Sequence, residues 1–238
     1  MKIALVGYGR MGHEIESVAK QRGHSIELII DKDNVEQFTA ENLKSVDVVI
    51  EFTTPSEAFA NVCKAFKAGV PVVSGTTGWL DKMEEARRVC LENNGAFFYA
   101  SNFSIGVNVM FAVNRKLAQL MRDFSQYDVT VEETHHTGKV DAPSGTAITL
   151  AQGILENSDR KKSWVDGWTT NPSELGVTSV RRGVVPGVHT IIWESDQDTI
   201  VLSHSAKNRR GLAMGAVLAA EYVADKKGIF SMNDMLGI

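Results

Sequence analysis

Apolar and polar residues alternate in blocks along the N-terminal part of the chain. Short apolar runs, such as residues 2–6 and 47–52, are typical of buried strands, and segments with helical spacing follow them. Glycine or proline lies at the ends of several helical segments, where helices usually begin or stop. Strands that alternate with helices predict an α/β fold, with a Rossmann-type, doubly wound parallel sheet in residues 1–103.

The pattern changes after Phe103. Residues 108–124 form a helical pattern with one apolar stripe, which consists of Val113, Leu117, Leu120 and Phe124. Residues 127–134 alternate as a half-buried strand does, a helix is predicted from Ser144, and residues 187–206 predict an antiparallel hairpin. Residues 104–209 are therefore expected to form a second, α+β domain with a mixed open sheet for substrate binding and oligomerisation. The hairpin has more apolar residues than a single small helix layer could cover, which predicts self-association; they are Ile191, Trp193, Ile200 and Leu202. The apolar helix in residues 210–238 is expected to rejoin the dinucleotide-binding domain, residues 1–103.

Charge and composition exclude two classes of partner. The 238 residues contain 25 Lys and Arg against 29 Asp and Glu, so no global basic field attracts nucleic acid. No apolar run approaches the ~18 residues that a membrane span needs, and Arg10 interrupts the N-terminal run before a signal-peptide core is complete. The sequence predicts a cytoplasmic protein with no nucleic-acid or membrane partner, whose Cys63 and Cys90 remain thiols.

The first turn has the sequence GYGRMG, and its glycines fit the pattern G-x-G-x-x-G. Glycines at this spacing permit a tight turn, a close approach of the backbone to a pyrophosphate, and a helix N-terminus that faces its charge. An acid, Asp31, follows about 20 residues later, where it can bind ribose hydroxyls. Lys32 could approach a 2′-phosphate, or it could be an ordinary solvated lysine. The predicted residues of this half of the cofactor site are Gly7, Tyr8, Gly9, Arg10, Met11, Gly12, Asp31 and Lys32.

Two further loops follow predicted parallel strands. Because ligands of open α/β sheets bind at the carboxyl edge of the strands, these loops are expected to line the nicotinamide half of the site. Ordinary turns are the alternative interpretation. The residues concerned are Gly75, Thr76 and Thr77 in the first loop and Ala100, Ser101, Asn102 and Phe103 in the second.

Residues 135–146, HHTGKVDAPSGT, concentrate the candidate chemistry in one long loop. His135 and His136 point to opposite sides of an extended chain and have no partners at ligand spacing, so no metal site is predicted. Ser144 can cap a helix whose first N–H groups, on Gly145 and Thr146, bind anions. With Lys139 and a histidine nearby, the loop predicts an anion pocket that contains a proton donor. A polar loop before a capped helix is the simpler alternative.

These motifs, with EFTTP and SNFSIGVNV, resemble the 4-hydroxy-tetrahydrodipicolinate reductase family, also called dihydrodipicolinate reductases. The resemblance implies a homotetramer that uses NADH or NADPH to reduce 4-hydroxy-tetrahydrodipicolinate to tetrahydrodipicolinate in diaminopimelate and lysine biosynthesis. It implies that His135 donates a proton and that Lys139 is the second catalytic residue. By the same resemblance, His136, Gly145 and Thr146 bind the substrate carboxylates. The glycine turn is one residue shorter than the family's G-x-G-G-R-M-G, and Asp31 stands where glutamate is common.

Two other functions are weighed against this one. Another two-domain Rossmann oxidoreductase, acting on an amino acid or a semialdehyde, shares the first domain but does not account for the His-His-x-x-Lys loop. A nicotinamide-binding sensor without chemistry needs no proton donor beside an anion pocket. The sequence decides neither the preference between NADH and NADPH nor which of Arg209 and Arg210 approaches the substrate.

Overall fold

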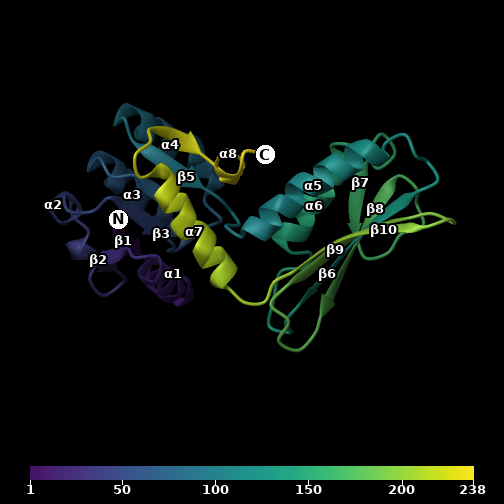
Figure 1. The fold of residues 1–238 in the computed structure, drawn as a ribbon, viewed down its shortest axis with the longest axis horizontal. Coiled ribbons are helices and arrows are strands. Elements are labelled where there is room, and N and C mark those ends of the chain that lie inside the picture. Colours follow the sequence, from purple (N-terminus) through teal and green to yellow (C-terminus); the bar gives the residue numbers. More distant parts are fainter. The chain divides into compact units, whose positions relative to one another are not determined.

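The computed structural model describes residues 1–238 as two compact units (Figure 1). The first unit contains Met1–Ile105 and Arg209–Ile238, and the second contains Gly106–Asn208. The predicted boundaries, after Phe103 and before Arg210, lie within two residues of these. No helix combines the length and the apolar character needed to cross a membrane.

A six-stranded parallel sheet forms the centre of the first unit, which confirms the Rossmann-type prediction. Its strand order is β11-β5-β4-β3-β1-β2. The strands are β1 (Lys2–Val6), β2 (Ser25–Ile30), β3 (Val48–Glu51), β4 (Val72–Ser74), β5 (Ala96–Tyr99) and β11 (Gly228–Phe230). The helices are α1 (Arg10–Gln21), α2 (Ala40–Leu43), α3 (Pro55–Lys67), α4 (Met83–Glu92), α7 (Arg210–Val223) and α8 (Met232–Leu236), with 3-10 turns at Val35–Gln37 and Leu80–Lys82.

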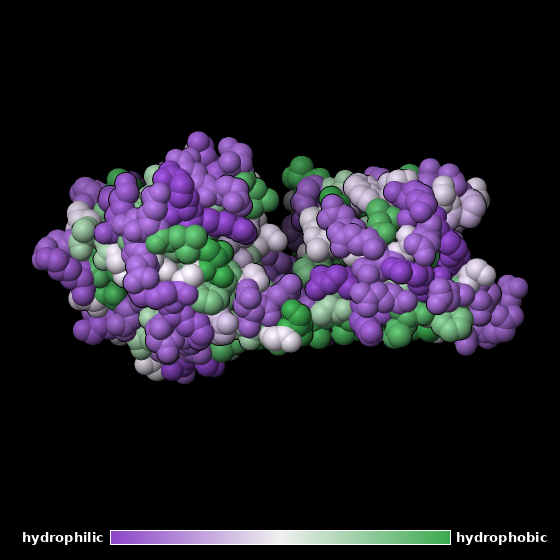
Figure 2. Space-filling view, turned by 90° about the horizontal axis from the view of Figure 1, so that it is seen from above, coloured by the Kyte–Doolittle hydropathy of each residue, from purple (hydrophilic) through white to green (hydrophobic).

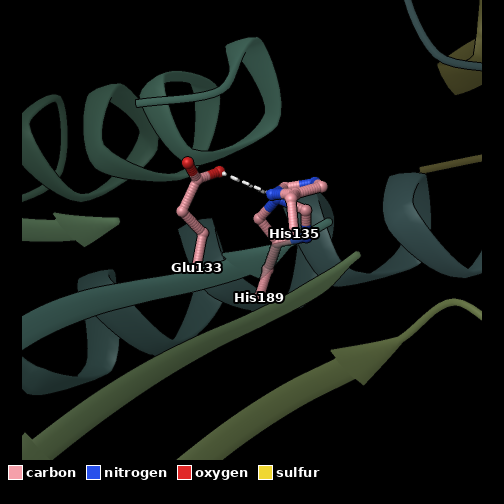
Figure 3. Close-up of side chains that lie close together, drawn as sticks. All are labelled: Glu133, His135 and His189. Carbon is pink, nitrogen blue, oxygen red and sulfur yellow. Dashed lines mark ion pairs between the residues drawn. The ribbon is translucent and has the colours of Figure 1, made fainter. Parts of the chain in front are cut away.

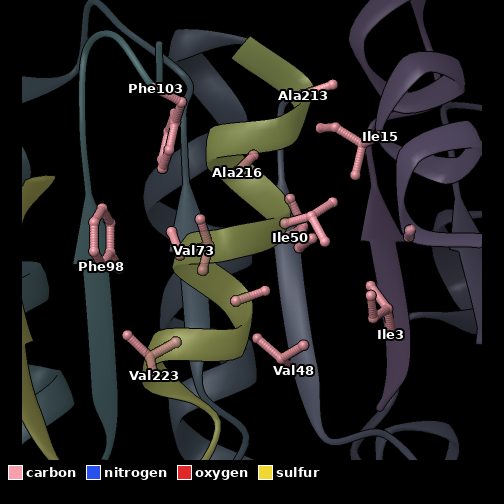
Figure 4. Close-up of a cluster of buried hydrophobic side chains, with 14 of the residues drawn as sticks. Ile3, Ile15, Val48, Ile50, Val73, Phe98, Phe103, Ala213, Ala216 and Val223 are labelled. Carbon is pink, nitrogen blue, oxygen red and sulfur yellow. The ribbon is translucent and has the colours of Figure 1, made fainter. Parts of the chain in front are cut away.

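Both faces of this sheet are buried. Ile3 and Leu5 pack with α1 and α7 on one face, whereas Ala4 and Val6 pack with α3 and α4 on the other (Figures 1 and 4). Burial on both faces explains why the strands read as continuous apolar runs. Gly215 allows α7 to approach closely, because a Cβ there would lie 1.7 Å from the backbone oxygen of Phe103.

The second unit is a mixed five-stranded sheet of order β10-β9-β6-β8-β7, which confirms the predicted mixed sheet. The strands are β6 (Asp128–His135), β7 (Ser163–Asp166), β8 (Glu174–Arg181), β9 (Val188–Glu194) and β10 (Thr199–Ser205). Strand β6 pairs parallel with β8 and antiparallel with β9. Helices α5 (Ile105–Met121) and α6 (Gly145–Leu155) lie side by side against one face, over a core that includes Val131, Leu150 and Trp193 (Figure 1).

The apolar stripe predicted for α5 is not its buried side. Val113 and Leu120 are 44% and 57% exposed, and Phe124, just after the helix, is 49% exposed. The core side instead contains Asn114, whose side-chain amide donates a hydrogen bond of 2.9 Å to the backbone oxygen of Leu150. This hydrogen bond to α6 partly offsets the cost of placing a polar residue at a core position. Figure 2 shows apolar side chains reaching a mostly hydrophilic surface.

The β9–β10 hairpin is better covered than the sequence analysis assumed. Ile191 and Trp193 are fully buried under α5 and α6, and Leu202 is half-buried in the same core. Of the four apolar residues that were expected to exceed one helix layer, only Ile200 is exposed, at 37%. The expectation was wrong about the helix side because two helices, not one, cover this face.

Candidate active site

The glycine turn after β1 has the geometry of a dinucleotide-binding turn. Gly7 has φ +92°, and a Cβ there would lie 2.0 Å from the backbone oxygen of Phe52. A Cβ on Gly12 would lie 2.6 Å from the backbone oxygen of Gly7, so only glycine lets α1 pack against the turn. Gly9 is the N-cap of α1, has no side-chain cap, and has open space where a Cβ would lie. The first N–H groups of α1 are therefore approachable by a pyrophosphate.

Asp31 and Lys32 follow β2 directly beside this turn. The parallel register pairs Val6 with Ile30, and the backbone N–H of Gly7 donates to the oxygen of Ile30 at 2.8 Å. Both side chains are exposed, as is Arg10, and Met11 is half-buried against the core. This placement lets the Asp31 carboxylate reach ribose hydroxyls and Lys32 reach a phosphate.

Helix α1 holds Tyr8 in place within the turn. The hydroxyl of Tyr8 donates a short hydrogen bond to Glu16, and its ring meets His13 edge-on at a centroid distance of 4.1 Å. This hydrogen bond to Glu16 raises the pKa of Tyr8. The partners Glu16 and His13 were not predicted from the sequence.

The loops after β3, β4 and β5 meet at the carboxyl edge of the sheet. Their centre is Glu51, a fully buried residue whose carboxylate accepts hydrogen bonds from Ser74 at 2.5 Å and from Thr76 at 2.7 Å. The backbone N–H of Thr53 donates to the same carboxylate at 3.0 Å. Glu51 therefore ties the EFTTP segment to the predicted nicotinamide loop that contains Thr76 and the exposed Thr77. An acid at the end of a buried apolar strand was the sequence signal that could have revealed it.

Phe52 lies between the two predicted nicotinamide loops. A Cβ on Gly75 would lie 2.2 Å from the Phe52 ring, and this ring is 5.7 Å from that of Phe103. Asn102 shapes the second loop by accepting a hydrogen bond of 2.8 Å from the backbone N–H of Ser104. In this loop Ala100 and Phe103 are buried, Asn102 is half-buried and Ser101 is exposed.

In the second unit, His135 is the last residue of β6 and is only 7% exposed. Its Nδ1 lies 3.3 Å from Oε2 of Glu133, and Nε2 of His189, on β9, lies 3.6 Å from the same oxygen (Figure 3). The two imidazole rings meet edge-on at 5.0 Å. One carboxylate oxygen thus lies between two buried histidines.

The other oxygen of Glu133 accepts three hydrogen bonds. The donors are the backbone N–H of Ser144 at 3.1 Å, the hydroxyl of Ser179 at 3.0 Å and a guanidinium N–H of Arg181 at 3.0 Å. Burial raises the pKa of Glu133, but the nearby His189 and the hydrogen bonds from Ser144, Arg181 and Ser179 outweigh it and hold this pKa well below its usual range. Glu133 is therefore a buried anion at neutral pH.

Burial lowers the pKa of His135 to about 4, and Glu133 only partly opposes this effect. The charges of His189, Lys139 and Arg181 lower the pKa further. His135 is consequently neutral at neutral pH in the free protein. A negatively charged ligand beside it would raise its pKa and so favour the protonated form that a general acid needs.

Glu133, His135 and His189 also have the spacing of a metal site, since their ligand atoms lie within 4.8 Å of one another. No metal was predicted, and Glu133 and His189 were not recognised from the sequence. The charge of Glu133 is already matched by Arg181 at 3.0 Å, and three donors bind one of its oxygens. This chemistry fits a hydrogen-bonded cluster better than a zinc centre, which needs the carboxylate as its own ligand.

Arg181 also holds the loop that contains Lys139. Its guanidinium donates to the backbone oxygens of Asp141 at 2.6 Å and Lys139 at 3.4 Å. The Nζ atom of Lys139 lies 2.7 and 2.8 Å from the two carboxylate oxygens of Asp141, and this hydrogen bond lowers the pKa of Asp141. Lys139 is therefore held by Asp141 near His135, rather than in contact with it.

The N-terminus of α6 adjoins the same cluster. The Oγ atom of Ser144 accepts a hydrogen bond of 3.2 Å from the N–H of Ala147, which confirms the predicted cap, and lies 3.2 Å from Nε2 of His189. Gly145 is exposed with open space where a Cβ would lie, and Thr146 is half-buried. The positive end of α6 is thus accessible to an anion.

Glu133 and Arg181 bring together the proposed donor, the lysine loop and the helix N-terminus. His136, also half-buried, follows His135 on the other side of the chain, beside Gly138. The two arginines between which the sequence does not decide as substrate contacts both belong to the first unit. Arg209 is the N-cap of α7, and Arg210 donates to Gln21 at 2.6 Å.

Comparison with known proteins decides the family. Residues 1–103 match the family described as "Dihydrodipicolinate reductase, N-terminus", and residues 106–236 match "Dihydrodipicolinate reductase, C-terminus". The chain belongs to the dihydrodipicolinate reductase family. The resemblance seen in the motifs is thereby confirmed, and the chain is an oxidoreductase.

Relatives match along the whole chain. A 4-hydroxy-tetrahydrodipicolinate reductase of Christiangramia forsetii is 49% identical over 237 residues, which cover 99% of this chain and 98% of the relative. One from Methanocaldococcus jannaschii is 35% identical and covers 100% and 98% of the two chains. A dipicolinate-bound dihydrodipicolinate reductase from a Paenisporosarcina species has a TM-score of 0.78 at 23% identity and covers 97% of each chain. This last likeness shows the shared fold.

Proposed function

We propose that this family member catalyses the NAD(P)H-dependent reduction of 4-hydroxy-tetrahydrodipicolinate to tetrahydrodipicolinate in diaminopimelate and lysine biosynthesis. In net terms, the substrate loses its hydroxyl group as water and gains one hydride and one proton. The observation that carries the proposal is the cluster in which His135, held by Glu133, adjoins the N-terminus of α6. A proton donor and an anion site side by side are what a reductase of a dicarboxylate requires.

His136, Gly145 and Thr146 bind the substrate carboxylates in this proposal. The N–H groups of the first turn of α6 and the positive end of its dipole favour carboxylates. The Paenisporosarcina relative is a dipicolinate-bound enzyme, and dipicolinate is an aromatic dicarboxylate. A bound dicarboxylate also supplies the negative charge that raises the pKa of His135 from about 4 toward neutrality.

His135 then delivers the proton that completes the reduction. The reduced nicotinamide, when bound, supplies the hydride. His135 protonates the negative charge that the substrate gains, and the Lys139 ammonium stabilises this charge before the proton arrives. Asp141 keeps Lys139 in place for this role.

The first unit binds NADH or NADPH in this proposal. Gly7 to Gly12 hold the pyrophosphate, Asp31 binds the ribose of NADH, and Lys32 attracts the 2′-phosphate of NADPH. The loops that contain Gly75–Thr77 and Ala100–Phe103 surround the nicotinamide. Both cofactors are used, because one residue favours each of them.

We also propose a cytoplasmic homotetramer assembled through the second unit. The face of its sheet opposite α5 and α6 has no covering helix within the second unit, and Val201 on this face is 58% exposed. Ile192, its cross-strand partner, is half-buried. Apolar residues on an open sheet face are typical of an interface between subunits.

The decisive experiment follows NAD(P)H absorbance with purified protein. We expect oxidation only when the product of the preceding synthase is supplied, and none with amino acids or semialdehydes. Cofactor binding without turnover would favour the sensor. A semialdehyde dehydrogenase would also need an accessible thiol, whereas both cysteines are buried and burial raises the pKa of Cys90 to about 11.

A further inference from the structure

Glu133 is a fully buried carboxylate to which the proposed reaction assigns no role. It lies in β6 two residues before His135 and on the same face of the sheet. Three donors saturate one of its oxygens, whereas the other has only the two imidazoles beside it, at 3.3 and 3.6 Å. Burying a charged group is costly, so its retention here calls for an explanation.

We propose that Glu133 is the positioning residue of the proton donor: it holds the proton of His135 on Nδ1 and leaves Nε2 to act on the substrate. The proposal rests on the proposed function, in which His135 is the donor. Nδ1 of His135 and Oε2 of Glu133 are both buried without a hydrogen-bond partner elsewhere, and the two atoms lie 3.3 Å apart. A carboxylate can only accept, so the facing nitrogen must be the one that carries hydrogen in the neutral ring.

The opposite edge of the His135 ring is fixed by Gly187. A Cβ on Gly187 would lie 3.0 Å from Nε2, and Gly187 has φ +158°, which side chains rarely adopt. The ring is therefore held between a carboxylate on one edge and a glycine on the other. This arrangement defines the orientation of Nε2 without a bulky neighbour beside it.

Charge is the second part of the role. His135 faces the cations Arg181 and Lys139 and the imidazole of His189, while Asp141 pairs with Lys139 and His204 is the cross-strand partner of His189. Among the charged groups that shift the pKa of His135, Glu133 is the one that raises it, because its negative charge favours the imidazolium. An amide in its place would donate to Nδ1, and so would reverse the tautomer and oppose protonation.

The tautomer can be measured in the unmodified protein. Nitrogen-15 NMR correlation spectra of the histidines distinguish a protonated Nδ1 from a protonated Nε2 at a pH where His135 is neutral. We expect hydrogen on Nδ1 in the wild-type protein and on Nε2 in Glu133→Gln. An Nε2-protonated wild-type ring would overturn the proposal, even if Glu133→Gln failed to fold.

Kinetics provide the second readout. We expect Glu133→Gln to lower kcat by roughly tenfold to a hundredfold with KM changed by less than about threefold. The pH above which kcat/KM falls should be lower in this variant than in the wild-type protein, by about one unit or more, because the imidazolium is less stable without the anion. Glu133→Asp, which keeps the charge, should recover part of the rate.

The matched control is Glu156→Gln, at the exposed C-cap of α6 and away from both the site and the open sheet face. This variant makes the same charge change and should keep the wild-type rate and pH profile. Equal losses in both variants, or a Glu133→Gln profile that does not move, would contradict the positioning role. If the wild-type protein showed no turnover of the cyclic substrate, the proposed function would fail. The NMR measurement of the His135 tautomer would still test the role of Glu133.

Discussion

The buried His135 should make the protein sensitive to acid in a way that one substitution removes. Its pKa is about 4 in the folded protein against 6.5 for an ordinary histidine, so the unfolded chain takes up this proton first as the pH falls. Stability is therefore lost progressively from about pH 6.5 downward. The cost from this one residue is about 2.5 kcal/mol at pH 4.5, whereas it is close to zero at pH 7.5.

Urea unfolding at about pH 7.5 and at about pH 4.5 measures this cost. Three of the four tryptophans lie in the second unit, so fluorescence reports on the part of the chain that contains His135. We expect the wild-type protein to lose about 2.5 kcal/mol more on acidification than His135→Gln, which has no proton to take up. Ile191→Val deletes a methylene group in the apolar core of the second unit and provides a control without a titrating group.

Ile191→Val should reduce stability by the same amount at both pH values, typically about 1 kcal/mol. If the wild-type protein and His135→Gln lost stability in parallel on acidification, His135 would not be a buried neutral histidine. Substrate charge would then not be needed to raise the pKa of His135.

Four further outcomes are expected. Lys139→Ala should lower kcat by roughly tenfold or more in steady-state assays while NADH binding, measured by fluorescence titration, stays unchanged, because the cofactor binds the first unit. Thr146→Val should raise KM with a smaller effect on kcat, since it holds a carboxylate in ground and transition states alike. Asp31→Ala should weaken NADH more than NADPH in the same titrations, and equal losses would show that Asp31 is structural. Light scattering should give a tetrameric mass, and Val201→Lys on the open sheet face should reduce it; a wild-type monomer at micromolar concentration would refute the proposed assembly.

The parallel sheet could be predicted from the sequence because its signals are local. The strands β1, β3, β4 and β5 are short, mostly apolar runs, and the glycine turn has fixed spacing, so neither signal depends on distant residues. The structure explains the spacing directly: Gly7 and Gly12 each occupy a position where a Cβ would collide with backbone. The short elements β11, α2 and α8, of three to five residues, have too few positions to show a period.

The buried side of α5 could not be chosen from periodicity. Two stripes of the helix run in parallel, one with the larger side chains Val113 and Leu120 and one with Asn114 and Ala118. The second is buried, and Asn114 on it finds a backbone acceptor on α6. Such a partner is known only once the two helices are placed together.

The residues of the proposed chemistry could be recognised from the sequence because they are close together in it. The residues that hold them in place could not. His135, Lys139 and Thr146 lie within one loop, but Glu133 meets Arg181 and His189 only through the register of β6 with β8 and β9. Val129, Val131, Glu133 and His135 alternate on one face of β6, so the pattern did contain an acid in an apolar row.

Each unit places one fully buried carboxylate at the end of a strand beside its proposed site. Glu51 accepts hydrogen bonds from the end of β4 and from the segments after β3 and β4, and Glu133 accepts them from the N-cap of α6 and from β8. These hydrogen bonds offset the cost of removing a charge from water only when all donors are present together. A buried carboxylate is consequently a strict geometric constraint: it fixes several loops at once, which a set of apolar contacts cannot do with the same directionality. On this argument the loops of both sites are positioned before any ligand binds.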